Sequence, residues 1–388
     1  MKIGLMGCEF SSPNKGCEAL TYSIISILNN FKCVDNNSTV YNYSGTGLGL
    51  IENEFKKFKF IEVEPNLKDL SFKYIKSLHE CDIILDATMG DSFSDIYSEG
   101  YYKRLMRNKK IAELLCKNYV LLPQTYGPFN SKKSEKIAAR VLNKAKKIYC
   151  RDNISKELLE NKFNIKNIEL ATDMAFILPF KRSMYSFNSN KKIKIGINVS
   201  GLLYKGGFNS TNQFNMKVNY KDYIDRVIKY FSNNEKYEVH IIPHVIDLNE
   251  NAYDDDYKVS KTIQQKFDKC ILAPDFKNPI EAKSYISNMD IFIGSRMHST
   301  IAAFSTGVIT IPISYSRKFE GLFNSLNYKY VINGRDEDTD SAYKKTIEYV
   351  MNNEKLKEEQ INAQQIIDQK KEKFIISLEQ IINEVKER

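Results

Sequence analysis

Short apolar runs rich in β-branched residues alternate with longer amphipathic segments along almost the whole chain, and this alternation limits the fold most. In the first half the runs are KIGLMG, STVYNY, CDIILDAT, YVLLPQT, KIYCRD and IELATDM. A second series begins with KIKIGINVS and continues with YEVHIIPHV, CILAP, DIFIGS, VITIPISY and KYVIN. Such runs, separated by helical segments, are typical of parallel sheets with helical crossovers. The sequence therefore predicts two doubly wound α/β domains.

The chain of 388 residues is too long for one ordinary core and suits two domains. We predict an N-terminal α/β domain over residues 1–178, a polar linker over 179–192, a C-terminal α/β domain over 193–337 and a helical segment over 338–388. Apolar residues recur at helical spacing in the last segment, at Ile367, Phe374, Leu378, Ile381 and Val385. This spacing favours a packed helix over a coiled coil. Two such domains would face a cleft at the carboxyl ends of their strands.

Charge and composition exclude several classes of protein. The 57 Lys and Arg residues exceed the 48 Asp and Glu residues by nine, which favours acidic ligands but lacks the basic arms of a nucleic-acid binder. Seven cysteines without a C-x-x-C pair indicate a reducing compartment and no structural zinc site. The sequence has neither a membrane-spanning apolar stretch nor a signal peptide, so we expect a cytoplasmic location.

The segment GSRMHST, residues 294–300, carries the strongest chemical signal. It follows the buried strand IFIG, and Ser295 is expected to cap a helix that has Arg296 and His298 in its first turn. Free N–H groups, the helix dipole, a guanidinium fork and an imidazole together favour a phosphate or a carboxylate. A second basic cluster that includes Lys318 follows the next strand. A purely structural role for these residues stays open at this point.

Polar residues also follow the strands of the first half: Asn14, Asp91, Ser92, Gln124, Arg151 and Asp173. Carboxylates in such loops can accept hydrogen bonds from sugar hydroxyls or deprotonate one of them. The alternatives are turns, helix caps and an ion pair between Arg151 and Asp152.

These segments together resemble the polysaccharide pyruvyl transferase family. The resemblance rests on NKGCEAL, GDSFSDIY, PQTYGPF, YCRD and TDMAF, and most specifically on GSRMHSTIAAFSTGVITIPISYSRKFEGLF, and it runs from about residue 3 to about residue 330. It implies two Rossmann-like domains of the glycosyltransferase B type. It also implies transfer of a pyruvyl group from phosphoenolpyruvate to a sugar of a cell-surface polysaccharide, such as an exopolysaccharide or a capsule, as a ketal.

The resemblance assigns phosphoenolpyruvate to Arg296, to the backbone of Met297 and to His298, with Arg151 reaching across from the other domain, and it matches Asp173 to a family aspartate. One departure concerns the acceptor pocket, because this chain has TMGD where many members have three glycines. We expect a pocket of different shape.

Ketal formation requires an acid and a base. His298 is the candidate acid, because imidazole changes its charge near neutral pH, and Asp91 or Asp173 is the candidate base. Asn14, Ser92, Gln124 and Lys318 complete the expected substrate-binding set. The scheme requires no metal and no cofactor, since phosphoenolpyruvate is itself the donor substrate.

Other interpretations are weaker. His240 and His244 are expected in the core or at its rim rather than as metal ligands, the run DDD at 254–256 as a solvated loop, and GTGLGL at 45–50 lacks the dinucleotide-binding spacing. A glycosyltransferase that uses a nucleotide sugar, with a diphosphate held by Arg296 and Lys318, remains the main rival. A non-catalytic sugar-binding or assembly protein is the second.

A basic stripe is predicted on one helix, formed by Lys132, Lys136, Arg140, Lys144 and Lys147. Such a stripe can lie against anionic lipid headgroups at the inner face of the membrane and bring a lipid-linked acceptor to the enzyme. A solvated helix face in a lysine-rich protein is the alternative.

Overall fold

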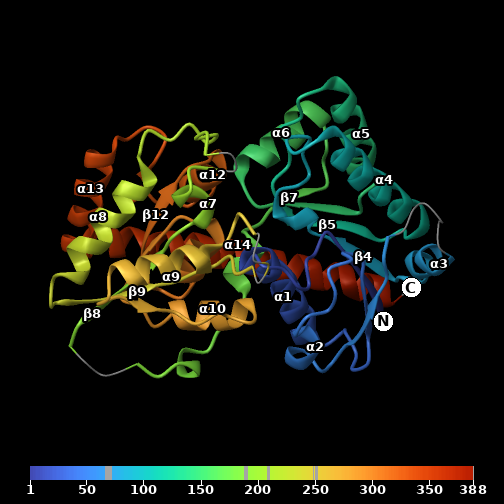
Figure 1. Ribbon diagram of the computed structural model, residues 1–388. Coiled ribbons are helices and arrows are strands. Elements are labelled where there is room, and N and C mark those ends of the chain that lie inside the picture. The colour runs from blue at the N-terminus through green and yellow to red at the C-terminus, as the bar shows by residue number, and fades with distance from the viewer. Residues whose placement is uncertain (66–71, 188–190, 208–209, 248, 250–251, 388) are drawn as a thin grey trace. The chain divides into compact units, whose positions relative to one another are not determined.

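The computed structural model describes residues 1–65, 72–187, 191–207, 210–247, 249 and 252–387, apart from the side chains at positions 317, 318 and 320. The chain divides into two compact units. Unit 1 comprises Met1–Ser12, Leu20–Ile177 and Asp368–Arg388, and unit 2 comprises Pro13–Ala19 and Leu178–Ile367. Figure 1 shows the strands and helices of both units in the colours of the chain order.

Unit 1 contains a sheet of seven parallel strands in the order β3-β2-β1-β4-β5-β6-β7. The strands are β1 (Lys2–Met6), β2 (Thr39–Asn42), β3 (Lys59–Glu62), β4 (Ile83–Asp86), β5 (Tyr119–Gln124), β6 (Lys147–Cys150) and β7 (Ile168–Leu170). The chain builds outward from β1 to β3 and then crosses to β4 on the other side of β1. The loops after β1 and β4 therefore leave the sheet at its switch point, where open α/β sheets bind ligands.

The helices of this part of the chain connect successive strands. They are α1 (Lys15–Asn30), α2 (Ile51–Glu54), α3 (Phe72–Glu80), α4 (Glu99–Leu115), α5 (Lys132–Leu142) and α6 (Asn153–Phe163), with 3₁₀ turns η1 (Thr88–Gly90) and η2 (Met174–Ile177). Side chains at the N-caps explain where three of them begin, because Ser98, Ser131 and Asp152 accept backbone N–H groups of the first turns of α4, α5 and α6. Apolar faces of these helices cover strands that are themselves buried, which explains the continuous apolar runs of the sequence.

Unit 2 contains six parallel strands in the order β10-β9-β8-β11-β12-β13. The strands are β8 (Ile193–Asn198), β9 (Tyr237–Ile241), β10 (Ile271–Leu272), β11 (Ile291–Gly294), β12 (Ile309–Ser314) and β13 (Ile332–Asn333). The helices are η3 (Arg182–Met184), α7 (Gly201–Tyr204), α8 (Tyr220–Ser232), α9 (Asp256–Lys266), α10 (Pro279–Ile286), α11 (Met297–Ser305), α12 (Arg317–Asn324) and α13 (Thr339–Met351). Here the switch point lies between β8 and β11.

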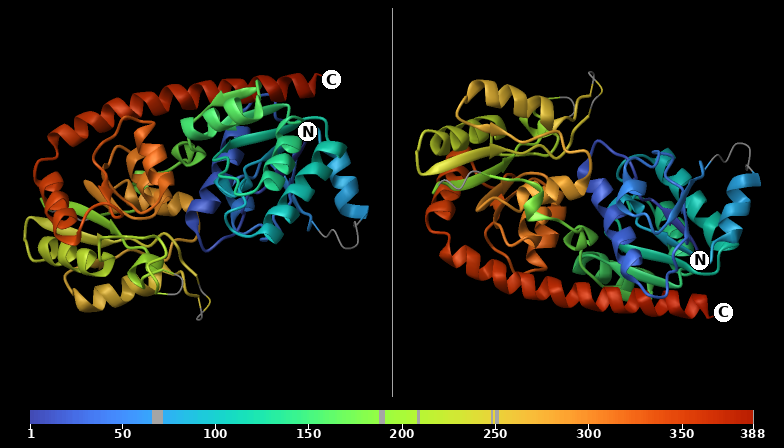
Figure 2. Two further views of the ribbon diagram at one scale, coloured as in Figure 1. Left: turned by 90° about the horizontal axis from the view of Figure 1, so that it is seen from above. Right: turned by 90° about the horizontal axis from the view of Figure 1, so that it is seen from below.

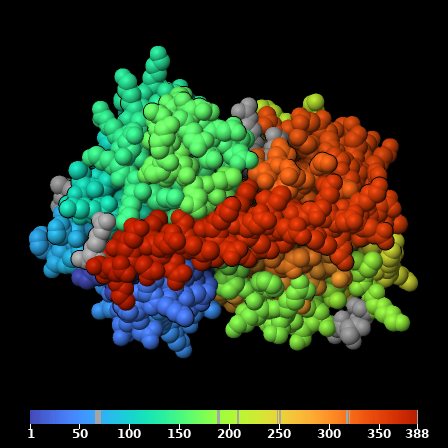
Figure 3. Space-filling model, turned by 180° about the vertical axis from the view of Figure 1, so that it is seen from behind, coloured from blue at the N-terminus to red at the C-terminus, as the bar shows by residue number. Residues whose placement is uncertain are grey.

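The C-terminal helix α14 (Glu354–Lys386) runs unbroken from residues of unit 2 into residues of unit 1. Figure 2 shows it as one continuous red helix, and Figure 3 shows its outer face open to solvent. In unit 2 the side-chain oxygen of Gln360 accepts the backbone N–H of Thr310, on β12, at 3.0 Å. In unit 1 the ring of Phe374 lies 4.9 Å from the ring of Tyr149 on β6. The apolar positions that the sequence singled out in this helix are all buried.

The prediction of two doubly wound α/β domains followed by a helical segment is confirmed. Every apolar run named from the sequence contains a strand, but the prediction missed β3 (Lys59–Glu62). β3 is an edge strand, and its first residue is an exposed lysine that dilutes the apolar signal.

The compact units divide the chain differently from the predicted domains. Residues 13–19 belong to unit 2, and the helical segment 338–388 is shared between both units. The predicted linker also packs on unit 2, because the rings of Tyr185 and Phe187 each lie 5.1 Å from the ring of Tyr285.

The predicted basic stripe is wrong in its second half. Helix α5 ends at Leu142, so Lys144 lies beyond it, and Lys147 is on β6, where its ammonium pairs with Glu169 at 2.7 Å. Lys132, Lys136 and Arg140 remain as exposed cations on α5. None of the described helices has a stretch long and apolar enough to cross a lipid bilayer.

Candidate functional site

The start of α11 in unit 2 lies at the switch point of the six-stranded sheet. β11 ends at Gly294, where an added Cβ would lie 2.5 Å from Cε1 of Phe292, so the turn into the helix requires glycine. The predicted N-cap at Ser295 is wrong: its hydroxyl is buried and bonds the hydroxyl of Tyr220 at 2.5 Å. Arg296 is the N-cap, in extended conformation, and Met297 and His298 are the first two helical residues. The helix thus begins one residue later than the sequence predicts.

The guanidinium of Arg296 is buried between two carboxylates. Its Nη2 lies 2.7 Å from Oδ1 of Asp256, its Nε also bonds Asp256, and both of its terminal nitrogens bond Asp254. Burial alone would lower the pKa of Arg296, but Asp256 and Asp254 raise it well above its ordinary value. The predicted anion-binding fork is therefore already engaged by carboxylates of its own unit.

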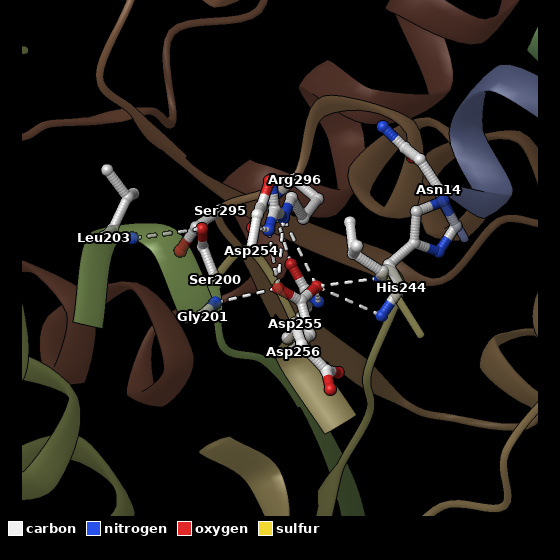
Figure 4. Close-up of polar contacts among 12 residues, drawn as sticks. Asn14, Ser200, Gly201, Leu203, His244, Asp254, Asp255, Asp256, Ser295 and Arg296 are labelled. Atoms are coloured by element: carbon white, nitrogen blue, oxygen red, sulfur yellow. Dashed lines mark hydrogen bonds and ion pairs between the residues drawn. The ribbon is translucent and has the colours of Figure 1, made fainter. Parts of the chain in front are cut away.

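Asp256 organises this part of unit 2 (Figure 4). Its carboxylate is fully buried and accepts the backbone N–H groups of Gly201 at 2.8 Å, Val245 at 3.0 Å and His244 at 3.2 Å, besides the guanidinium of Arg296. It thereby ties together the loops that follow β8, β9 and β11. The prediction of a solvated loop at 254–256 is wrong, because Asp256 is this buried hub and Asp255 is the buried N-cap of α9.

Two histidines lie at the start of α11, and they differ in burial. His244 is buried, and neither of its ring nitrogens has a hydrogen-bond partner among the residues that the structure describes. Burial and the neighbouring His298 lower the pKa of His244 to about 3, against the opposing effect of Asp256. His298 is half-buried, and Gly16 packs directly on its ring: a Cβ at Gly16 would lie 2.4 Å from Nδ1. Glycine at position 16 thus makes room for the histidine.

His240, considered with His244 from the sequence, has a different role. Its Nδ1 lies 2.8 Å from the hydroxyl of Tyr285 and its Nε2 lies 3.0 Å from Glu238. It is a satisfied core histidine, as expected.

The segment 13–19 brings two further polar residues into unit 2. Asn14 forms an antiparallel bridge with Val245, and the backbone N–H of Lys15 donates to the carbonyl of His244 at 3.0 Å. The ammonium of Lys15 is buried and pairs with Glu18 at 2.9 Å. Sequence analysis selected Asn14 but missed Lys15, Asp254 and Asp256, because each is one polar residue in a polar stretch and gains its role only through contacts distant in sequence.

The side chains at the start of α11 carry more negative than positive charge, so they do not attract an additional anion. Arg296 and Lys15 face three carboxylates, those of Asp254, Asp256 and Glu18. Of the two carboxylates on Arg296, that of Asp254 is partly exposed, whereas that of Asp256 is fully buried. An anionic ligand can therefore take the place of Asp254 on the guanidinium, while Asp256 keeps the guanidinium in position.

In unit 1, Arg151 follows β6 and is buried. Its Nη1 pairs with Asp173 at 2.8 Å and its Nε donates to Thr125 at 2.8 Å. The suggested pair of Arg151 with Asp152 is not formed, because Asp152 caps α6. Asp173 also accepts the backbone N–H of Ala175 at 2.9 Å, so its carboxylate holds Arg151 and the start of η2 rather than standing ready to take a proton.

The loop after β4, which carries Asp91 and Ser92, contacts Arg151 at Gly90. An added Cβ at Gly90 would lie 3.2 Å from Nη1 of Arg151, which places this loop against the guanidinium. Asp91 is half-buried and accepts the hydroxyl of Tyr97 at 3.3 Å. Gln124 is fully buried, and its amide donates to the backbone carbonyl of Asp86 at 3.1 Å. Asp86 is the last residue of β4, so Gln124 stabilises the point from which the loop begins.

Two sets of predicted residues are thus assembled: Arg151, Asp173, Asp91, Ser92 and Gln124 in unit 1, and Asn14, Arg296, Met297 and His298 in unit 2. Lys318 lies in α12, and its side chain is outside the described residues. Each set lies at the carboxyl ends of the strands of its own sheet.

Comparison with solved structures supports the fold. The chain is similar to Anabaena HepE in complex with UDP and glucose, with 12% identity, 99% of this chain and 98% of that chain covered, and a TM-score of 0.59. It is also similar to UDP-GlcNAc 2-epimerase from Neisseria meningitidis bound to UDP-GlcNAc (13%, 95% and 99%, 0.57) and to sucrose-phosphate synthase from Thermosynechococcus elongatus (8%, 99% and 99%, 0.55). At these identities the likeness shows the glycosyltransferase B type of fold and nothing about ligands.

No match to a curated protein was found. The sequence pattern of polysaccharide pyruvyl transferases matches residues 14–317, which include both assembled sets and most of the chain. The chain belongs to the polysaccharide pyruvyl transferase family.

Proposed function

We propose that this protein transfers the pyruvyl group of phosphoenolpyruvate to two hydroxyls of one sugar, forming a ketal and releasing phosphate. The acceptor is a sugar of a cell-surface polysaccharide or of its lipid-linked precursor. The observation that carries the proposal is the start of α11 in a chain of this family, where a buried arginine and a histidine stand at the N-terminal end of a helix. Both anionic groups of phosphoenolpyruvate suit such donors.

Donor binding requires an exchange at Arg296. The carboxylate or phosphate of phosphoenolpyruvate replaces Asp254 on the guanidinium, while Asp256 and the backbone N–H groups around it stay fixed. The N–H of Met297 and the dipole of α11 add to the attraction, since both act at the first helical turn. Lys318 is proposed as a further cation for the same anion.

Proton transfer is assigned to His298. Of the two histidines, His244 is uncharged near neutral pH, because its pKa is about 3, so it has no imidazolium proton to donate as the acid. His298 delivers a proton to the methylene carbon of phosphoenolpyruvate, and a sugar hydroxyl attacks the cationic carbon and loses its own proton. The carbon–oxygen bond to phosphate then breaks, and the second hydroxyl attacks the new cation and loses its proton. One released proton replaces the one that the methylene took up, and the other leaves with phosphate.

On the acceptor side, Asp91 is the proposed base. Asp173 was the other candidate, but its carboxylate is fully engaged by Arg151 and Ala175, so we assign it to positioning Arg151. Ser92 and Asn14 are proposed to contact substrate, and Gln124 supports the loop that carries Asp91. This scheme uses no metal and no cofactor.

We place the reaction in the cytoplasm, with Lys132, Lys136 and Arg140 of α5 as a contact to the anionic inner face of the membrane. Three exposed cations give a weak attraction that salt weakens. Sedimentation with phosphatidylserine vesicles at low and high salt tests this contact, and negligible binding at low salt would remove it from the proposal.

A glycosyltransferase that uses a nucleotide sugar is the second candidate. A cavity of about 330 Å³ in unit 2, lined by Tyr204, Phe214, Lys217 and Lys221 among others, favours it, because aromatic and cationic side chains suit a nucleotide. Parallel incubations with phosphoenolpyruvate and with UDP-glucose, each with a panel of glycosides, discriminate the two by phosphate release and product mass.

A further inference from the structure

The loop after β4 in unit 1 contains three consecutive residues in the left-handed region. The φ angles are 43° at Thr88, 51° at Met89 and 79° at Gly90. Glycine adopts such angles freely, but threonine and methionine do so at a cost, and threonine is the least tolerant because it is β-branched. This is also the loop in which the chain has TMGD, where a pocket of different shape was expected.

Thr88 is held in this conformation by a buried network. Asp86 accepts its backbone N–H at 2.9 Å and its hydroxyl at 2.8 Å, and the ammonium of Lys109 bonds Asp86 at 2.5 Å and the hydroxyl of Thr88 at 2.7 Å. The hydroxyl of Tyr119 bonds the same carboxylate. The side chain of Thr88 therefore contributes to the bonds that stabilise its own strained backbone.

The backbone hydrogen bond at position 89 does not require a methionine. The backbone N–H of Met89 donates to the carbonyl of Gly7 at 2.7 Å, a bond that glycine would make equally well. Its side chain is half-buried, and its sulfur accepts the hydroxyl of Tyr101 at 3.8 Å. Residues in strained backbone conformations cluster at ligand sites.

The side chain of Met89 lines a cavity of about 310 Å³ that lies entirely within unit 1. The loops after β1 and β4 form it at the switch point of the sheet, and its polar lining includes Glu9, Ser44, Arg104 and Asn108, with the ring of Tyr101 beside them. A carboxylate, a hydroxyl, a guanidinium and an amide around an aromatic ring suit a ligand rich in hydroxyl groups. The volume is at the lower end for ligand sites, which suits a single pyranose ring.

We propose that this cavity receives the sugar ring of the acceptor and that Met89 determines specificity there. The methionine side chain occupies space that a glycine would leave open, and it limits the size of the substituent on the ring that lies against it. The identity of this ligand as the acceptor rests on the proposed function, whereas the size selection depends only on the cavity.

The test is Met89→Gly, with Asn164→Gly as the matched control. Asn164 also has a positive φ, 52°, and lies in unit 1, but it caps the exposed end of α6 away from the cavity. NMR titrations measure the binding of methyl glucoside and methyl galactoside and of their N-acetylamino counterparts. In Met89→Gly we expect the affinity for the N-acetylated sugars, relative to the parent sugars, to rise about tenfold or more, and in Asn164→Gly we expect no change.

Met89→Ala keeps the backbone cost but shortens the side chain, so it should shift the same ratio in the same direction even if the glycine variant folds poorly. An unchanged ratio in both variants, or no binding of any of the four sugars to the wild-type protein, would overturn the inference. Phosphate release from phosphoenolpyruvate is measured separately. A shifted ratio without any phosphoenolpyruvate turnover would refute the proposed function alone, and turnover with an unchanged ratio would refute this inference alone.

Discussion

Asp256→Asn removes one charge from the centre of unit 2 and should destabilise it strongly. The carboxylate accepts three backbone N–H groups and the guanidinium of Arg296, and it is fully buried. An asparagine amide at this position places an N–H₂ group against the N–H donors that the carboxylate accepted. It also leaves Asp254, which is partly exposed, as the remaining carboxylate that pairs with Arg296. Removing one partner of a buried ion pair costs about 3–5 kcal/mol. For a unit of this size we expect a fall in Tm of roughly 6–20 °C.

Asp254→Asn is the matched control, because it makes the same chemical change on the same arginine at a partly exposed site. Pairs of that kind contribute about 0–1 kcal/mol, so its Tm should stay within a few degrees of the wild-type value. Differential scanning calorimetry of both variants, with urea unfolding as a second measurement, gives the comparison. If Asp256→Asn unfolds within about 1 kcal/mol of the wild-type protein, Asp256 is not the hub that its hydrogen bonds indicate.

Four further predictions concern the same site. Asp254→Asn should bind phosphoenolpyruvate more tightly than the wild-type protein, because the competing carboxylate loses its charge; weaker binding in a calorimetric titration would contradict the exchange at Arg296. His298→Asn should lower turnover by about 10²–10⁴-fold, while the affinity for phosphoenolpyruvate stays nearly unchanged. Gly16→Ala should also lower turnover, because the added Cβ displaces the ring of His298, whereas the Cβ added in Gly100→Ala meets nothing within 4 Å and should have no effect. Equal rates in the two glycine variants would refute the steric role of Gly16. The pKa of His244 is about 3 in the folded state and near 6.5 in the unfolded state, so the unfolded state takes up a proton first as the pH falls. The free energy of unfolding therefore decreases as the pH drops below 6.5, by at most about 1.4 kcal/mol per pH unit. His244→Leu should make this decrease smaller in urea titrations, and an unchanged slope would contradict the prediction.

The fold could be predicted from the sequence because its signal is local. Each central strand is buried on both faces and so appears as a continuous apolar run, as IFIG does for β11. The edge strand β3 has no such signal, since its first residue, Lys59, is exposed. The one-residue error at α11 has a similar cause: Ser295 has the composition of a cap, but its hydroxyl is used by Tyr220, a residue far away in the sequence.

The site could be predicted only in part. Arg296 and His298 share one helix start, so the pattern of residues placed them together. The carboxylates that engage Arg296 come from a loop about forty residues earlier, and their aspartate-rich run has the composition of a solvated loop. The positive φ angles at Thr88 and Met89 were equally hidden, because neither residue type favours them.

Incubation of the purified protein with phosphoenolpyruvate and a panel of glycosides tests the central claim most directly. The account predicts phosphate release that depends on both substrates, and a product that has gained one pyruvate and lost one water. It also predicts that His298→Asn abolishes most of this release while its Tm stays close to the wild-type value. Consumption of UDP-glucose with phosphoenolpyruvate left intact would contradict the account, and so would full phosphate release by the His298 variant.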